Sequence, residues 1–328
     1  MMRFRSATLA CVALAAVVSA KVAVAADLPT LRIGWTVPGE EAKWLIMKRP
    51  ELFAGIGKTY RAEWFQFQGT PPIAQALVAN ALDCGTQSPV SFAQAVGEGD
   101  LKAYILGSLV QEKVGYASVF WATLDGLPIH DAKDLKGKTI ASTVFNGGIY
   151  FYLLEWLKRG GVDPAKDLKL VEIPFPQVEA QLRAGRIAAG PFAQPFASRA
   201  MEKGGIRTLF KLSDLQSPLT DIFEACRKDV ADGKASLVKA YMEDFKAATK
   251  WAIAHPEDAK KVTSEVTKID YATLDKYLMS DQDFYRDPIG KPDFPSIQKT
   301  WDLLTDAGYL KTRMTATDYA KPELTPAE

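Results

Sequence analysis

Two stretches of sequence decide the fold: LDCGTQSP at residues 82–89 and TIASTVFNGG at residues 139–148. In each stretch a short apolar run gives way to glycine and hydroxyl-bearing residues, and a helical pattern follows. A strand that ends in this way presents free backbone N–H groups at the start of the next helix, where an anionic or polar ligand can bind. Two such units in separate lobes predict a small molecule held in a cleft between them.

The rest of the chain repeats this pattern. Strand-like and helix-like segments alternate, which favours mostly parallel sheets. In the first lobe we expect strands at residues 31–35, 60–67, 82–85 and 101–108, and helices at 40–49, 73–80 and 89–96. In the second lobe we expect strands at residues 139–141, 168–173, 187–191 and 206–211, and helices at 149–158, 178–184 and 195–203.

Two extended segments, residues 119–122 and 221–226, are expected to leave and re-enter the first lobe. The C-terminal part is predicted to be mostly helical, at residues 235–255, 256–266, 271–279 and 296–307. The predicted division is a signal peptide at 1–26, lobe 1 at 27–117 plus 223–328, and lobe 2 at 118–222. Lobe 1 is therefore discontinuous in sequence.

The N-terminus has the pattern of a signal peptide. Arg3 and Arg5 precede the apolar stretch 9–18, and small residues at 23–26 offer a cleavage site near Ala26 or Asp27. A membrane anchor is the alternative, but the apolar stretch is shorter than the roughly 20 residues that a spanning helix needs. We therefore expect a soluble periplasmic protein that is exported and then cleaved.

Composition argues against several function classes. The 328 residues carry 40 basic and 39 acidic side chains, a formal net charge of +1, and no charge block recommends a nucleic-acid partner. His130 and His255 are the only histidines, and no Ser-His-Asp order, phosphate-binding loop or metal cluster is visible. We accordingly expect no catalytic residues, no metal and no cofactor, with an enzyme on the same architecture as the minor alternative.

Two cysteines remain after cleavage, Cys84 and Cys226, without a CxxC motif or a cluster with histidine. An exported protein permits a disulfide between them. Two isolated buried thiols are the interpretation that the residues alone favour.

The chain resembles the periplasmic solute-binding proteins of ABC importers for nitrate, alkanesulfonates, taurine and related small acids. The resemblance runs from Leu31 to about Leu310, and the order and spacing of its motifs carry it. These motifs are LRIGW at 31–35, QAL at 75–77, LDCG at 82–85, Pro89 with FAQA at 92–95, DLKGKTIA at 134–141, YLL at 152–154 and QPF at 194–196.

This resemblance implies a bilobed periplasmic-binding-protein fold of type II-like form, two α/β lobes joined by two crossing segments that close on a ligand. It implies delivery of a small organic anion to an ABC permease in the inner membrane, by a monomer and without catalysis. A sensory protein that docks to a membrane receptor is an alternative. The implied ligand-binding residues are Trp35, Thr36, Gln68, Gly69, Thr70, Thr86, Gln87, Ser88, Thr143, Asn146, Gly147, Gly148, Phe175, Phe192 and Gln194.

Departures from the family pattern bear on the ligand. Many relatives have Gly-Ser-Thr where this chain has residues 147–149, GGI, and Trp-Asp-Pro-Phe where it has residues 193–196, AQPF. Losing the carboxylate disfavours an ammonium-bearing ligand such as taurine, because a buried cation needs a partner. Losing the bulkier side chains enlarges the pocket. An organic acid larger than nitrate fits these changes better. Carboxylates and sulfonates, including aromatic ones, belong to this class.

Several of these residues also have a structural interpretation. Ser88 is a good helix cap before Pro89, and Trp35 has the character of a core residue. Lys43 and Arg183 are the cations nearest the implied loops. The resemblance further implies that the strand after the return crossing lies beside the third strand of lobe 1, which would bring Cys226 close to Cys84.

Overall fold

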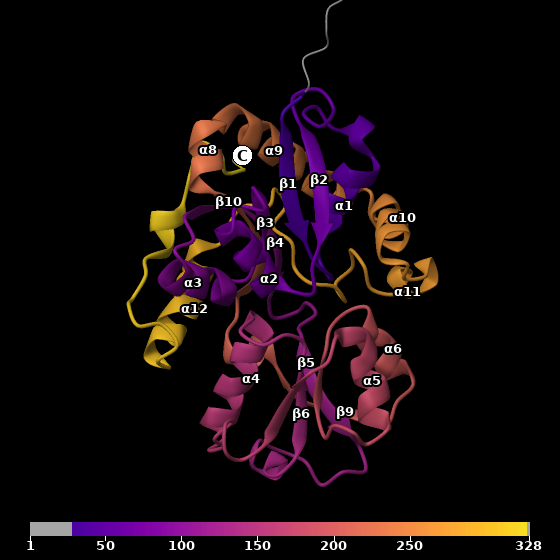
Figure 1. Ribbon diagram of the computed structural model, residues 1–328. Coiled ribbons are helices and arrows are strands. Elements are labelled where there is room, and N and C mark those ends of the chain that lie inside the picture. Colours follow the sequence, from indigo (N-terminus) through magenta and orange to yellow (C-terminus); the bar gives the residue numbers. More distant parts are fainter. Residues whose placement is uncertain (1–27, 327–328) are drawn as a thin grey trace, which may run out of the picture.

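The computed structural model of the protein describes residues 28–326, so the predicted signal peptide at 1–26 lies outside the described residues. Two α/β lobes lie one above the other, and the chain passes between them twice (Figure 1). We call lobe 1 the part built on strands β1–β4 and β10, and lobe 2 the part built on β5–β9. Lobe 1 also contains the C-terminal helices.

The sheet of lobe 1 has the strand order β2-β1-β3-β10-β4. Strand β1 pairs in parallel with β2 and β3, whereas β10 returns from lobe 2 and runs antiparallel to β3 and β4. The mostly parallel sheet predicted from the alternating pattern is therefore present, with the returning strand inserted in it. The strands are β1 Thr30–Trp35, β2 Arg61–Gln66, β3 Cys84–Gln87, β4 Ala103–Glu112 and β10 Leu219–Arg227.

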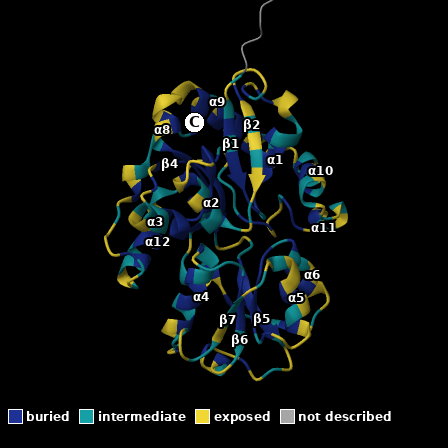
Figure 2. Ribbon diagram, viewed as in Figure 1, coloured by how far each residue is buried: buried dark blue, intermediate teal, exposed yellow. Residues whose placement is uncertain are grey.

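Helices cover both faces of this sheet. Helix α1 packs against α9 and α10 on one face, and α2, α3 and α12 pack together on the other. Figure 2 shows that the strands between them are mostly buried, apart from the edge strand β2. The helices are α1 Glu41–Lys48, α2 Thr70–Val78, α3 Pro89–Gly99, α8 Lys228–Gly233, α9 Ala235–Ala254, α10 Pro256–Thr267, α11 Tyr271–Asp275 and α12 Phe294–Asp306.

The C-terminal helix α12 fixes the start of α3. The indole Nε1 of Trp301, a fully buried residue, donates a hydrogen bond of 2.9 Å to the carbonyl oxygen of Pro89. The Trp301 ring also stacks on Phe92, with 6.1 Å between ring centroids. Because Pro89 opens α3, this contact holds the helix N-terminus in a fixed position relative to the sheet.

Lobe 2 has a smaller mixed sheet. Strand β5 pairs antiparallel with β8 and β9, β6 pairs in parallel with β7, and the bridge between Ile140 and Ala189 joins the two groups. The strands are β5 Phe120–Leu124, β6 Thr139–Ser142, β7 Lys169–Glu172, β8 Gly190–Phe192 and β9 Ile206–Lys211. The helices are α4 Gly148–Arg159, α5 Phe175–Arg183, α6 Phe196–Glu202 and α7 Leu212–Leu215.

Several element boundaries differ from the sequence-based expectation, and four of them have a clear consequence or cause. Helix α5 begins at Phe175, because Pro176 suits a first helical turn. Helix α12 begins at Phe294, where the Asp293 side chain caps the N–H of Ser296 at 3.0 Å. Helix α11 ends at Asp275, and β4 continues to Glu112, so the strand itself leads into the first crossing.

A disulfide joins Cys84 of β3 to Cys226 of β10. The two residues are direct partners in the antiparallel ladder, with 4.0 Å between their Cα atoms, and both are fully buried. The favoured interpretation of two isolated thiols is therefore wrong, and the proximity of the two cysteines that the resemblance implies is confirmed. Residue patterns alone could not show it, because a return crossing brings together cysteines that are 142 residues apart.

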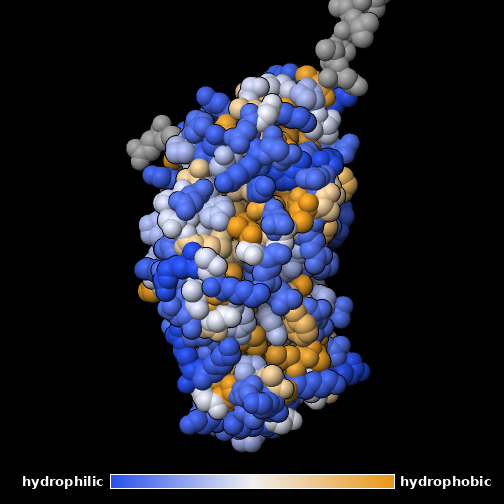
Figure 3. All heavy atoms as spheres, turned by 60° about the vertical axis from the view of Figure 1, so that its left-hand side comes forward, coloured by the Kyte–Doolittle hydropathy of each residue, from blue (hydrophilic) through white to orange (hydrophobic). Residues whose placement is uncertain are grey.

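The face of the molecule drawn in Figure 3 is mainly hydrophilic. Figure 3 shows one face on which apolar side chains form scattered patches over both lobes. Within residues 28–326, no helix has the length and apolar character needed to cross a membrane.

Candidate ligand-binding cleft

Two helix N-termini of lobe 1 meet at the boundary between the lobes. Helix α2 follows Gly69, which has no capping side chain, and α3 follows Ser88, whose hydroxyl accepts a hydrogen bond of 3.2 Å from the N–H of Ser91. The Thr70 hydroxyl donates to the Ser88 hydroxyl at 3.2 Å. The capping interpretation of Ser88 is therefore confirmed, and its hydroxyl also connects the two helices.

A third helix N-terminus faces them from lobe 2. Helix α4 follows Gly147, which again offers no capping side chain. A Cβ atom placed on Gly148 would lie 3.5 Å from Ser88 Cβ, and one placed on Gly147 would lie 3.7 Å from Pro71 Cγ. The first turns of α2, α3 and α4 thus converge, and the positive ends of their dipoles face this place from both lobes. Pro71, Pro72 and Pro89 have no N–H, so most of the N–H groups here come from the first turn of α4.

Gly69 is required at its position by backbone conformation and by space. Its φ is +91°, a value that L side chains rarely adopt. A Cβ atom on Gly69 would lie only 2.8 Å from Val144 Cγ1 in the opposite lobe. The absence of a side chain here allows the two lobes to approach each other.

Hydrogen bonds link this contact to the interior of lobe 1. The N–H of Gly69 donates to the Thr36 hydroxyl at 3.0 Å, and the N–H of Thr36 donates to Glu40 Oε1 at 3.0 Å. The Thr86 hydroxyl donates to the same Glu40 oxygen. Glu40 therefore holds the loops after β1 and β2 and the end of β3 in position. Because the Thr86 hydroxyl proton is donated to Glu40, it is not available to a ligand.

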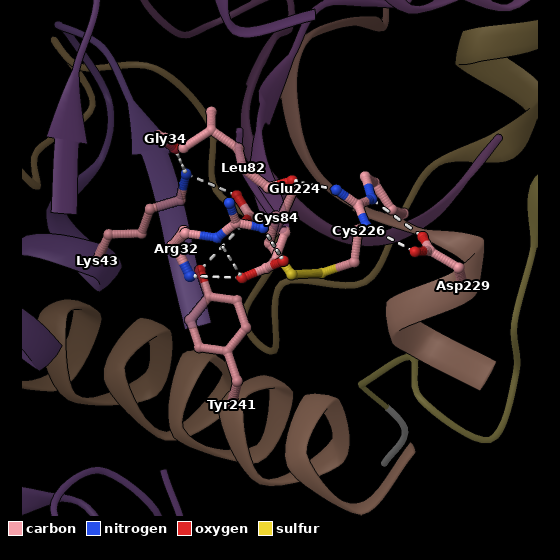
Figure 4. Close-up of a disulfide and its surroundings, with 11 residues drawn as sticks. Arg32, Gly34, Lys43, Leu82, Cys84, Glu224, Cys226, Asp229 and Tyr241 are labelled. Atoms are coloured by element: carbon pink, nitrogen blue, oxygen red, sulfur yellow. Dashed lines mark hydrogen bonds and ion pairs between the residues drawn. A yellow bond between two sulfur atoms is a disulfide. The ribbon is translucent and has the colours of Figure 1, made fainter. Parts of the chain in front are cut away.

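Three fully buried charged residues lie behind these loops, and we call Glu40, Lys43 and Glu224 the buried triad. Lys43 Nζ is 3.0 Å from Glu40 Oε2. It is also 2.6 Å from Glu224 Oε2 and donates to the carbonyl oxygen of Gly34 at 3.0 Å (Figure 4). The Tyr241 hydroxyl donates to Glu224 Oε1 at 3.1 Å. Two carboxylates thus share one ammonium in the interior.

Burial dominates the titration of Glu224. It raises the pKa of this carboxyl to about 7, against the opposing effect of Lys43. Burial opposes the charge of Lys43 as well, but Glu224 and Glu40 outweigh it and raise the pKa of Lys43. The ammonium is therefore charged at neutral pH, whereas the pKa of Glu224 lies near neutral pH.

The lobes also meet beside the first crossing segment. The side-chain amide of Gln194 donates to the carbonyl oxygen of Gln282 at 3.3 Å, a hydrogen bond between lobe 2 and lobe 1. A cavity of about 510 Å³ lies here, bordered by Tyr116, Gln194 and Lys211 among others. Gln194 therefore belongs to this cavity and not to the site where the helix N-termini meet.

The other candidate residues occupy different environments. Trp35 lies in the core of lobe 1, with its Nε1 unpartnered among the described residues, and Phe192 packs on Phe120 in lobe 2 with 5.6 Å between centroids. Gln87 is fully buried, and its side-chain amide donates to the carbonyl oxygen of Thr86 at 2.8 Å. The remaining candidates are partly or fully exposed: Gln68, Thr143, Asn146 and Phe175.

Neither cation named from the sequence is free to meet a ligand. Lys43 is held by the two carboxylates of the buried triad. Arg183 pairs with Glu179 at 2.9 Å and donates to the carbonyl oxygens of Ala200 and Gly204. At the boundary between the lobes, the converging N-termini of α2, α3 and α4 therefore supply positive potential that these two cations do not.

Sequence reasoning missed the positioning role of Glu40 and Glu224. Glu40 has the pattern of a favourable first-turn acid, and Glu224 lies in a run that predicts only an extended strand. The pairing of Lys43 with Glu224 depends on the return crossing and has no local signal. The run DIFEAC at residues 221–226, in which an acid interrupts a buried strand, was the one available indication.

Comparison with known proteins places this chain in a family. The model of the NMT1-like family matches residues 25–267, and the chain belongs to that family. The taurine-binding periplasmic protein of Escherichia coli is 26% identical over 211 residues, which cover 63% of this chain and 62% of that protein. The chain thus matches less than two thirds of the length of the first curated relatives.

Solved structures show the same fold. The periplasmic aliphatic sulphonate binding protein SsuA of Escherichia coli matches with a TM-score of 0.69 at 18% identity, over 92% of this chain and 94% of that one. The alkanesulfonate-binding protein SsuA of Xanthomonas axonopodis pv. citri, bound to MOPS, matches with a TM-score of 0.71 at 20% identity, over 90% of this chain and 99% of that one. The fold is therefore the bilobed periplasmic-binding-protein fold.

Proposed function

We propose that this protein captures a small organic anion, a sulfonate or carboxylate, between its lobes and delivers it to an ABC permease. The observation that carries the proposal is the convergence of the first turns of α2, α3 and α4, with uncapped glycines at Gly69 and Gly147. Helix N-termini bind anions through their free N–H groups. The names of the matched relatives, which bind sulfonates and taurine, support the same class of ligand.

The cellular setting is part of the proposal. The protein acts outside the cytoplasm as a monomer, and its N-terminal segment directs export. The disulfide between Cys84 and Cys226 supports this setting, because disulfides persist in oxidising compartments. No reaction is assigned to the protein, whose matched relatives are named as binding proteins.

A panel of four anions tests the function: nitrate, ethanesulfonate, benzenesulfonate and benzoate. We expect at least one organic anion to raise the melting temperature, because a ligand that binds only the folded state stabilises it by mass action. Taurine serves as the ammonium-bearing comparison and should give a smaller shift than ethanesulfonate. A panel in which no anion changes the melting temperature, up to millimolar concentration, would refute the proposal.

Replacing Gly69 by alanine should weaken binding of the panel anion by about 10- to 100-fold. The new Cβ would meet Val144 when the lobes are together and would also strain the backbone, at a cost of about 1–3 kcal/mol. Isothermal titration calorimetry measures the change. Gly57→Ala is the matched control, since Gly57 also has positive φ in lobe 1 but open space around it. Equal binding by Gly69→Ala and the parent would place the ligand elsewhere.

A further inference from the structure

The buried triad is connected to the proposed anion site through a continuous series of ion pairs and hydrogen bonds. Glu224 contacts Lys43, Lys43 contacts Glu40, Glu40 accepts from the N–H of Thr36, and the Thr36 hydroxyl accepts from the N–H of Gly69. Gly69 precedes α2 and contacts lobe 2. A change of charge in the triad is therefore transmitted to the place where we propose that the anion binds.

The charge of the triad depends on one proton. With both carboxylates ionised, the three buried side chains have a net charge of −1, and with one carboxylate protonated they are neutral. Glu40 accepts from Thr36 and Thr86 in addition to Lys43, whereas Glu224 has Lys43 and Tyr241. Glu224 is thus the member with fewer donors to stabilise its charge.

We propose that the protein takes up a proton when it binds an anion, and that Glu224 of the buried triad holds this proton. This inference rests on the proposed function and identifies the group that regulates the same site. A second negative charge near Glu224 stabilises its protonated form, so anion and proton bind with positive coupling. For two unit charges about 10 Å apart at an effective permittivity of about 20, Coulomb's law gives a coupling of roughly tenfold in affinity.

The direction of the pH dependence follows from this coupling. In the free protein the pKa of Glu224 is raised to about 7, mainly by burial. The negative charge of a bound anion raises this pKa further. Below pH 7 Glu224 carries the proton in both states, so the affinity for the anion is constant. As the pH rises above 7, the free protein loses the proton first, and the affinity falls towards a lower plateau.

The groups that face Glu224 come from three elements. Glu40 and Lys43 lie at α1, Tyr241 lies on α9, and from β3 the Thr86 hydroxyl contacts the triad. The Tyr241 ring packs edge-on against Tyr60, whose hydroxyl donates to Asp244 at 3.0 Å. The cysteines nearest to Glu224 do not titrate, because they form the disulfide.

Calorimetric titration of the panel anions tests the inference. All four anions are singly charged between pH 6 and 9, so the ligand itself contributes no change in protonation. Titrations at pH 8 in triethanolamine and in Tris, two cationic buffers that differ in ionisation enthalpy, give the number of protons taken up. For the parent we expect a fractional proton uptake at pH 8, little uptake at pH 6, and about tenfold weaker binding at pH 9 than at pH 6.

Two variants assign the proton to Glu224. Glu224→Gln should bind the anion with no proton uptake and with an affinity that is independent of pH. Tyr241→Phe removes a hydrogen bond that favours the ionised form, so its uptake should shift to higher pH. Glu112→Gln is the control, since Glu112 is another fully buried carboxyl, near Asp221 in the crossing segments, whose pKa is raised well above its usual value by burial.

The outcomes separate this inference from the proposed function. If no panel anion binds the parent at any pH, the proposed function fails and the inference fails with it. If an anion binds without proton uptake, or if Glu224→Gln takes up as many protons as the parent, the function stands and the inference is overturned. If proton uptake is lost in Glu112→Gln but kept in Glu224→Gln, the inference is also overturned. The proton would then be assigned to Glu112 and not to Glu224.

Discussion

Replacing Lys43 by methionine should lower the free energy of unfolding by about 3–5 kcal/mol at pH 8. Methionine fills a similar volume, but it leaves the carboxylates of Glu40 and Glu224 buried without their cation, and removing one partner of a buried ion pair has a cost of this size. Urea unfolding monitored by circular dichroism measures the loss.

This loss should depend on pH in a defined direction. Without Lys43, the pKa of Glu224 rises further above its unfolded value, so the variant is least destabilised at low pH and loses stability as the pH rises. Lys166→Met is the matched control, because Lys166 is exposed and pairs with the surface residue Asp163. A Lys43→Met protein as stable as the parent at pH 8 would show that the triad does not hold lobe 1 together.

Removing the disulfide should lower the free energy of unfolding by about 2–5 kcal/mol. Cys84 and Cys226 are 142 residues apart, so their crosslink restricts a large part of the unfolded chain. The double variant Cys84→Ala/Cys226→Ala tests this expectation by urea unfolding beside the oxidised parent. The parent unfolded with a reductant present should match the double variant, and equal stability of all three proteins would contradict the stabilising role.

The architecture was predictable because its signals are local. The alternation of short apolar runs and helical patterns located β1, β3 and β6, and the glycine-rich ends of the last two indicated where helices α3 and α4 begin. Boundaries set by tertiary contacts were less predictable. Strand β4 continues to Glu112 because it pairs with the returning strand β10, and that partner is more than 100 residues away in the sequence.

The candidate site was predictable only in part, for the same reason. Local patterns pointed to Ser88 and Gly148, and the family resemblance pointed to Gly69; the structure brings the three together at the boundary between the lobes. They could not show that Thr86 faces Glu40, or that Phe192 packs within lobe 2. The direction of a side chain depends on strand register and lobe packing, which are properties of the folded chain.

A crystal structure of the protein with a bound panel anion tests the central claim most directly. We expect the anion to lie between the lobes, with its oxygen atoms within about 3 Å of backbone N–H groups in the first turns of α2, α3 or α4. That position would place it beside Gly69, Ser88 and Gly148. An anion bound only in the cavity beside Tyr116 and Lys211, or outside the interlobe boundary, would contradict the account.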